Sequence, residues 1–153
     1  MKTIPTLFFS TLLMLFSVNQ AISQEKYEII LSVDTDKFSI QNMDDTCSFG
    51  QGDEICNECY TVEVEKGDTV IWKGKSSSSE EDTVEITSIK YSNGTDLFNN
   101  KELRASNGEV TGTIAKGNAG QYLKYDIYFK LYRSGNYIGE FSIDPKLRMR
   151  RLR

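Results

Sequence analysis

Histidine is absent from the 153 residues, and only three cysteines and two prolines occur. Without an imidazole, the chain has no Ser-His-Asp or Cys-His catalytic group, no His-ligated zinc and no His₂Cys copper centre. An enzyme built on this sequence would depend on carboxylates, Tyr, Lys or Cys. What is present is eight Tyr, eight Phe and eleven Gly, with 39% hydrophobic residues. In a chain of this length, that composition indicates one β-rich domain.

The first 23 residues have the pattern of a cleaved secretory signal peptide. Lys2 gives a positive start, Leu7 to Val18 is almost wholly apolar, and Ala21 and Ser23 are small residues placed where a cleavage site needs them. A retained membrane anchor would need about 18–20 apolar residues, more than this run contains. We therefore expect an exported protein, secreted or periplasmic, whose mature chain is residues 24–153, a single domain without a transmembrane segment.

Three cysteines, Cys47, Cys56 and Cys59, lie in a Gly- and acid-rich stretch, residues 44–59, which we name the cysteine loop. In an oxidising compartment, we expect one disulfide and one remaining thiol, with Cys47 pairing with Cys56 or Cys59 to close a small loop. Two alternatives stay open. One is a metal site of three thiolates and a nearby carboxylate, and the other is a redox pair formed by Cys56 and Cys59.

Most of the mature chain alternates between apolar and polar residues with a period of two, which is typical of β-strands. Trp72 is in phase with Val70 and is therefore expected in the core. A change of phase at Thr87-Ser88 predicts a β-bulge, and Ser134-Gly135-Asn136 has the chemistry of a hairpin turn. One helical turn is expected in Leu97 to Arg104. The expected strands are 27–33, a short 37–41, 60–65, 69–73, 83–91, 120–132 and 137–149.

Four segments occur in an order that resembles the AidA/PixA family of bacterial inclusion-body proteins. They are Val33 to Asp36, Gly67 to Ser76, Val84 to Tyr91 and Gly139 to Leu147. The Gly67 to Trp72 piece also resembles a strand of cupredoxin-like sandwiches. The resemblance implies an all-β, antiparallel cupredoxin-like (immunoglobulin-like) β-sandwich of seven to eight strands with a non-catalytic character, and the missing histidines exclude the copper site of a cupredoxin. Fold alone does not supply a function.

The penultimate expected strand carries an aromatic stripe on its polar face. Tyr122, Tyr128 and Tyr132 alternate there with Lys124, Asp126 and Lys130, opposite the apolar face. Such a stripe fits a partner-binding surface, and cross-strand packing on a solvated sheet explains it as well.

Charge divides the mature chain into an acidic body and a basic end. Residues 24–145 hold 12 basic and 22 acidic side chains, a net charge of -10, whereas residues 146–153 hold five cations, Lys146, Arg148, Arg150, Arg151 and Arg153. This basic tail fits an anionic surface or an acidic patch on another copy. The alternative is a solvated strand end whose charges keep a sheet edge from pairing. A short tail on an acidic body is a poor footprint for nucleic acid.

Asp34 and Asp36 are the remaining candidates for a metal site. They lie two residues apart and fit a shared Ca²⁺, but calcium needs six to eight oxygen ligands and no EF-hand loop follows. An Asp-rich turn explains them better.

The sequence therefore predicts a non-catalytic interaction or assembly module without a cofactor. Its partner is a protein, a glycan or a second copy of the chain. The candidate binding residues are Tyr122, Tyr128, Tyr132, Arg148, Arg150, Arg151 and Arg153. The alternatives are a metal-binding module based on Cys47, Cys56 and Cys59, and a carbohydrate-binding lectin.

Overall fold

The computed structural model describes residues 24–151, and in this part of the chain strands predominate. The expected signal peptide and Arg153 lie outside the described residues. The strands are β1 Lys26–Val33, β2 Cys47–Ser48, β3 Thr61–Val64, β4 Thr69–Ser76, β5 Thr83–Gly94, β6 Glu102–Arg104, β7 Val110–Thr113, β8 Tyr122–Arg133, β9 Asn136–Ile143 and β10 Lys146–Met149. The helices are one α-helical turn, α1 Met43–Thr46, and two 3₁₀ turns, η1 Ile40–Asn42 and η2 Asn57–Cys59. No helix in residues 24–151 has the length and apolar character needed to cross a membrane.

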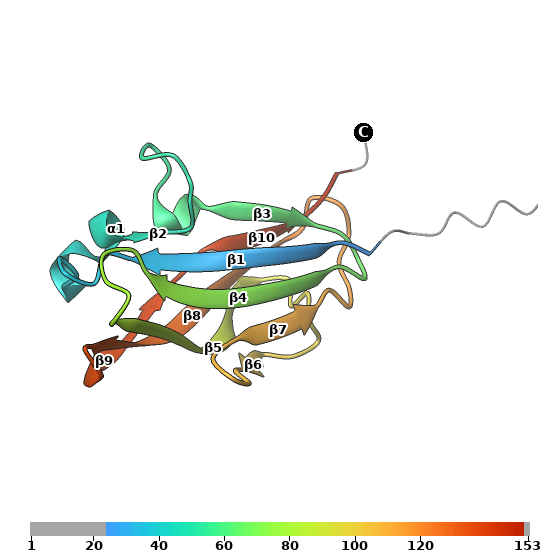
Figure 1. Ribbon diagram of the computed structural model, residues 1–153. Coiled ribbons are helices and arrows are strands. Elements are labelled where there is room, and N and C mark those ends of the chain that lie inside the picture. Colours follow the sequence, from blue (N-terminus) through green and yellow to red (C-terminus); the bar gives the residue numbers. More distant parts are fainter. Residues whose placement is uncertain (1–23, 152–153) are drawn as a thin grey trace, which may run out of the picture.

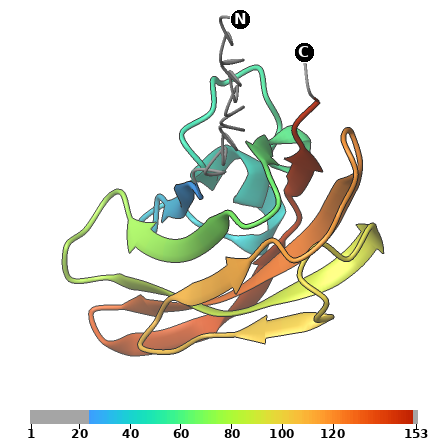
Figure 2. The same cartoon turned by 90° about the vertical axis from the view of Figure 1, so that its right-hand side faces the viewer.

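The strands form two sheets that pack face to face (Figures 1 and 2). One has four strands in the order β2-β1-β4-β7, and the other has six, in the order β3-β10-β8-β5-β6 with β9 also paired to β8. The all-β sandwich is therefore confirmed. The expected number of strands and their antiparallel arrangement are not confirmed. The described residues contain ten strands where seven to eight were expected, and both sheets are mixed, because β1 runs parallel to β4 and β10 runs parallel to β3.

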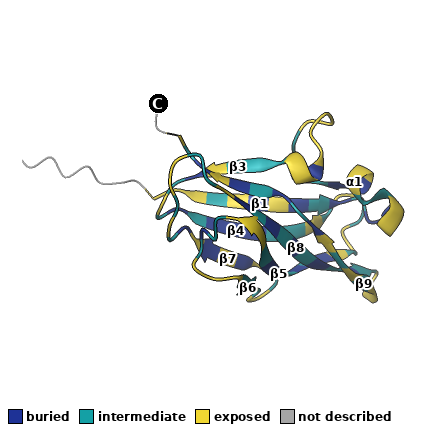
Figure 3. Cartoon of the chain, turned by 180° about the vertical axis from the view of Figure 1, so that it is seen from behind, coloured by how far each residue is buried: buried dark blue, intermediate teal, exposed yellow. Residues whose placement is uncertain are grey.

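One hydrophobic cluster fills the space between the sheets. Trp72 of β4 and Tyr125 of β8 are both fully buried there, as the alternation predicts, and the Trp72 indole N–H donates to the Tyr125 hydroxyl oxygen at 3.1 Å. Their rings meet edge to face, with centroids 5.6 Å apart. Figure 3 shows buried residues along the strands and exposed ones in α1 and many loops. The burial of alternate strand residues sets which side chains of β8 and β10 reach solvent.

The local expectations for β5 and the β8–β9 hairpin are confirmed. The pairing of β5 with β8 shifts register between Ile86 and Ser88, at the expected bulge. Ser134 and Gly135 have φ values of 45° and 78° and join β8 to β9 in a two-residue turn, as a hairpin of this kind requires.

Three expected elements are wrong. Residues 37–41 form no strand and lead into η1. Leu97 to Arg104 contains no helical turn and ends in β6, which pairs with β5. The expected strand 137–149 is interrupted at Asp144-Pro145, where Pro145 has no N–H to donate to a sheet. The two halves are β9 and β10.

Candidate functional site

The three tyrosines of the aromatic stripe share the solvent face of β8, but they have different surroundings. Tyr128 is half-buried, and the Lys90 ammonium lies 4.5 Å from its ring centroid. Tyr132 packs against Tyr137 of β9, with centroids 5.5 Å apart. Tyr122, at the start of β8, is 44% exposed. The three tyrosines therefore do not form one continuous exposed surface. Tyr122 is exposed, whereas Tyr128 and Tyr132 are partly buried.

The basic segment begins as a strand, because Lys146–Met149 form β10 and Arg150 and Arg151 follow it. β10 lies between β3 and β8, paired on both sides, so the expectation that its charges protect a sheet edge is wrong. Its register places Arg148 directly opposite Tyr122 and Lys146 directly opposite Lys124. Antiparallel pairing thus gathers side chains that are more than 20 positions apart in the sequence onto one patch of the six-stranded sheet.

Arg150 does not belong to this patch. Its guanidinium lies 2.9 Å from a carboxylate oxygen of Glu65 and donates to the Tyr27 hydroxyl oxygen, also at 2.9 Å. The Tyr27 hydroxyl in turn donates to Glu25. Burial, followed by the hydrogen bond to Glu25, raises the pKa of Tyr27 to about 12. Arg150 therefore ties β10 to β1 and to the end of β3, and its role is structural.

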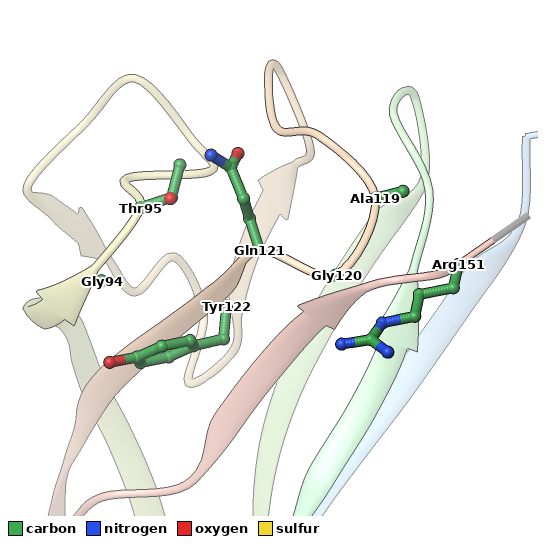
Figure 4. A pocket seen from close by; sticks show the side chains of 7 residues that line it. All are labelled: Gly94, Thr95, Ala119, Gly120, Gln121, Tyr122 and Arg151. Carbon is green, nitrogen blue, oxygen red and sulfur yellow. The ribbon is translucent and has the colours of Figure 1, made fainter.

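Two shallow hollows meet at Tyr122. The Arg151 hollow has a volume of about 410 Å³ and is drawn in Figure 4, where Tyr122 and Arg151 lie on opposite sides of Gly120. The Arg148 hollow has a volume of about 330 Å³. We name the two together the Tyr122 surface, which is lined by Asn93, Gly94, Thr95, Ala119, Gly120, Gln121, Tyr122, Lys124, Lys146, Arg148 and Arg151.

Two glycines allow the chain segments of the Tyr122 surface to come together. Gly94 has a φ of 85°, and a Cβ there would lie 2.3 Å from the Tyr122 carbonyl oxygen, which accepts a 2.7 Å hydrogen bond from the Thr95 amide. Gly120 has a φ of 81°, and a Cβ there would lie 3.0 Å from the Arg151 guanidinium. The end of β5 therefore approaches Tyr122 closely because Gly94 carries no side chain, and the positive φ of Gly120 suits a glycine in the loop before β8.

The cations of this surface are unequally neutralised. The Lys124 ammonium lies 2.7 Å from Asp144 and 3.6 Å from Glu58, and the hydrogen bond to Asp144 raises the pKa of Lys124. Within residues 24–151, the structure shows no ion pair for Lys146, Arg148 or Arg151, although Glu63 of β3 is the register neighbour of Arg148.

Placing Lys146 directly across from Lys124 costs stability, because like charges opposite each other on one sheet face repel. Asp144 and Glu58 offset this repulsion only at Lys124. The patch therefore has a surplus of positive charge on a chain that is otherwise acidic. A surface of this kind attracts anions.

In the cysteine loop, the expectation of one disulfide and one thiol is confirmed, but the expected pairing is wrong. Cys56 and Cys59 form the disulfide, with Cα atoms 5.1 Å apart, and both are exposed. Cys47 belongs to β2 and is 3% exposed, so its side chain lies in the core, away from solvent. Burial raises the pKa of the Cys47 thiol to about 12.

Asn57, between the two bridged cysteines, holds the loop to the body of the protein. Its side chain is 1% exposed, and its amide N–H groups donate to the carbonyl oxygens of Cys47 at 3.0 Å and Asp44 at 3.2 Å. Its amide oxygen accepts a hydrogen bond from Gln51 at 2.8 Å. The disulfide and these hydrogen bonds fix the loop, and the three sulfurs are not gathered as ligands.

The calcium candidates are also not brought together. Asp34 forms an ion pair with Lys37 at 3.1 Å, and a hydrogen bond from Lys37 lowers the pKa of Asp34. Asp36 is exposed, and its backbone amide donates to Ser78. Across residues 24–151, no group of three or more Cys, Asp or Glu side chains is arranged to hold a metal ion.

Sequence reasoning identified Tyr122, Arg148 and Arg151 and missed several of their neighbours. Asn93 and Thr95 reach the surface because the end of β5 pairs with the start of β8, where Asn93 lies opposite Lys124. Gln121 is positioned by its side-chain oxygen, which accepts a 2.8 Å hydrogen bond from the Asn118 amide. No short motif marks these contacts, since they depend on strand pairing.

Comparisons with known proteins show a likeness of fold without a detectable likeness of sequence. No family model matches the chain, and no curated protein matches it. A solved structure, the inclusion body protein PixA from Burkholderia cenocepacia J2315, has a TM-score of 0.60 over 86% of this chain and 99% of that chain, at 13% sequence identity. The chain therefore has a fold similar to that of this PixA inclusion body protein.

Proposed function

We propose that the protein is an exported, non-catalytic interaction module that binds an anionic partner through the Tyr122 surface. The observation that carries this proposal is the gathering of Lys146, Arg148 and Arg151 around an exposed tyrosine, without ion-pair partners in the described residues. The two hollows can accommodate groups of the partner, and the surplus of positive charge attracts an anionic one.

Electrostatic attraction governs the first step of binding. Because the rest of the mature chain is acidic, an anionic partner is repelled from most of the surface and guided to this patch. Contacts with Arg148 and Arg151 favour carboxylate, sulfate or phosphate groups, which a guanidinium can bind with two hydrogen bonds at once. The exposed ring of Tyr122 adds an apolar contact between these charges.

Binding of labelled inorganic polyphosphate, a linear polyanion, tests the proposal. We expect the mature protein to bind it at low salt and to lose affinity as salt rises, because the contacts are ionic. The variant R148Q/R151Q should bind at least tenfold more weakly. The control R104Q removes a cation from β6 of the same sheet, where Arg104 pairs with Glu102 at 3.1 Å. Equal affinity of R148Q/R151Q and wild type would contradict the proposal.

Export is a separate part of the proposal and rests on the pattern of the first 23 residues. Mass spectrometry of the protein expressed in its natural host should find a mature N-terminus at Gln24, in the periplasm or the medium. A cytoplasmic protein that retains Met1 to Ser23 would contradict export and would leave the binding proposal standing.

A second copy of the chain is the alternative anionic partner, which would make the protein an assembly module. A hollow of about 260 Å³ within the cysteine loop is lined in part by Asp44, Asp45 and Asp53 and complements the Tyr122 surface in charge. Sedimentation at increasing protein concentration in low salt tests this alternative. Self-association that R148Q/R151Q abolishes would favour assembly, and a monomer throughout would exclude it.

A further inference from the structure

The two hollows of the Tyr122 surface share one wall, the side chain of Tyr122. A small anion fills one hollow and leaves the other empty. A ligand that uses both must cross the exposed face of this tyrosine. The geometry therefore fits a chain-like ligand with one unit over the ring and one on either side.

Cations are placed on both sides of Tyr122. Arg151 lines one hollow, whereas Lys146 and Arg148 line the other. A ligand that matches this arrangement carries negative groups on the units to either side of the unit that covers the ring. The negative charge of such a ligand therefore lies on several of its repeating units and not on one terminal group.

The remaining polar side chains suit a ligand that carries hydroxyl groups. The exposed amide of Asn93 lines one hollow and the hydroxyl of Thr95 lines the other, and each side chain can both donate and accept hydrogen bonds. An exposed tyrosine ring offers an apolar face to the C–H groups of a sugar ring. Together these features fit a saccharide.

Single-stranded nucleic acid also combines stacking units with negative charge, but the surface fits it less well. Such ligands are bound by several aromatic side chains along a basic groove. Here the neighbouring tyrosine, Tyr128, is covered by Lys90. Tyr122 is the one aromatic residue among those that line the Tyr122 surface, so successive bases of a strand would find no second ring there on which to stack.

We infer that the Tyr122 surface binds an acidic saccharide chain, with one sugar ring stacked on Tyr122 and a carboxylate, sulfate or phosphate group in each hollow. This inference rests on the proposed function, because it names the chemical class of the anionic partner. It adds one requirement that a simple polyanion site lacks, which is the dependence of affinity on the aromatic ring.

The test compares four probes on the mature protein: a heparin-derived hexasaccharide, polyphosphate, oligothymidylate, and the neutral N-acetylglucosamine hexamer. We expect the hexasaccharide to bind more tightly than the other three at equal salt. Tyr122→Ala should weaken hexasaccharide binding by about tenfold, in the lower part of the range for removal of a ring that stacks on a nucleic-acid base, and should leave polyphosphate binding within twofold. Tyr122→Phe should restore hexasaccharide binding.

Tyr137→Ala is the matched control, because Tyr137 is 56% exposed on β9 and lies outside the surface. It should leave every affinity unchanged. The saccharide inference is overturned if Tyr122→Ala leaves hexasaccharide affinity unchanged, or if oligothymidylate binds as tightly as the hexasaccharide. The proposed function itself fails if R148Q/R151Q binds polyphosphate as tightly as wild type does. The two failures are therefore distinguishable.

Discussion

The hydrogen bond between Trp72 and Tyr125 gives the sharpest prediction about the sandwich. Both side chains are fully buried, and in residues 24–151 no buried side-chain nitrogen or oxygen lacks a partner. Tyr125→Phe keeps the ring and its edge-to-face contact but removes the oxygen that accepts the indole N–H at 3.1 Å. The variant would leave one buried donor unsatisfied.

An unsatisfied buried N–H costs about 1–3 kcal/mol of the free energy of unfolding. For a domain of this size, that corresponds to a fall in Tm of roughly 4–10 °C. Urea unfolding followed by Trp fluorescence measures the change directly, because Trp72 is the only tryptophan in the chain. The slope of the transition should stay the same, since the surface exposed on unfolding does not change.

A matched control and a second substitution separate the hydrogen bond from general effects. Tyr91→Phe removes a hydroxyl that donates to the Gly94 carbonyl at an exposed site, and it should change stability by less than about 0.5 kcal/mol. In a Trp72→Phe background, followed by circular dichroism, Tyr125→Phe should cost little, because the donor is already gone. A Tyr125→Phe protein as stable as wild type would refute the reasoning.

Three further predictions concern the cysteine loop and Arg150. Burial raises the pKa of Cys47 to about 12, so the native protein should not react with Ellman's reagent at pH 8, and one thiol per chain should react after unfolding in urea; rapid reaction of the native protein would contradict the core position of Cys47. Asn57→Ala removes the buried amide that holds the loop, and we expect a loss of about 2–3 kcal/mol in urea unfolding, whereas an unchanged midpoint would show that the loop does not depend on it. Arg150→Gln breaks a partly exposed ion pair with Glu65, which should lower the midpoint of urea unfolding only slightly and leave polyphosphate affinity within twofold; a tenfold loss of affinity would show that Arg150 contributes to binding.

The period-two alternation was enough to predict several of the strands, the burial of Trp72 and the bulge near Ser88, because these features depend on which neighbours along one strand share a face. The sandwich itself was implied by the family resemblance. The alternation did not show which strands pair with one another. The parallel pairs of β1 with β4 and of β10 with β3 join segments far apart in the sequence. No turn residue signals such a pairing.

The candidate site was predicted only in part, because strand pairing, which the alternation does not reveal, brings its residues together. Tyr122 and Arg148 each stood out locally, one as an outward tyrosine and the other as part of a basic run. Their position directly opposite each other follows from the antiparallel pairing of β8 and β10, which the alternation of either strand alone does not specify. The Cys56–Cys59 pair was kept only as an alternative, because Cys47 was expected to form the disulfide, whereas Cys47 lies in β2 and is buried.

The central claim is that the Tyr122 surface is where the protein binds its partner. Amide chemical-shift mapping by ¹H–¹⁵N NMR during titration with the heparin-derived hexasaccharide tests it most directly. We expect the shifted amides to cluster in residues 93–95, 119–124 and 146–151, and Tyr122→Ala to reduce these shifts at equal ligand concentration. Shifts confined to the cysteine loop, residues 44–59, or spread evenly over the surface would contradict it.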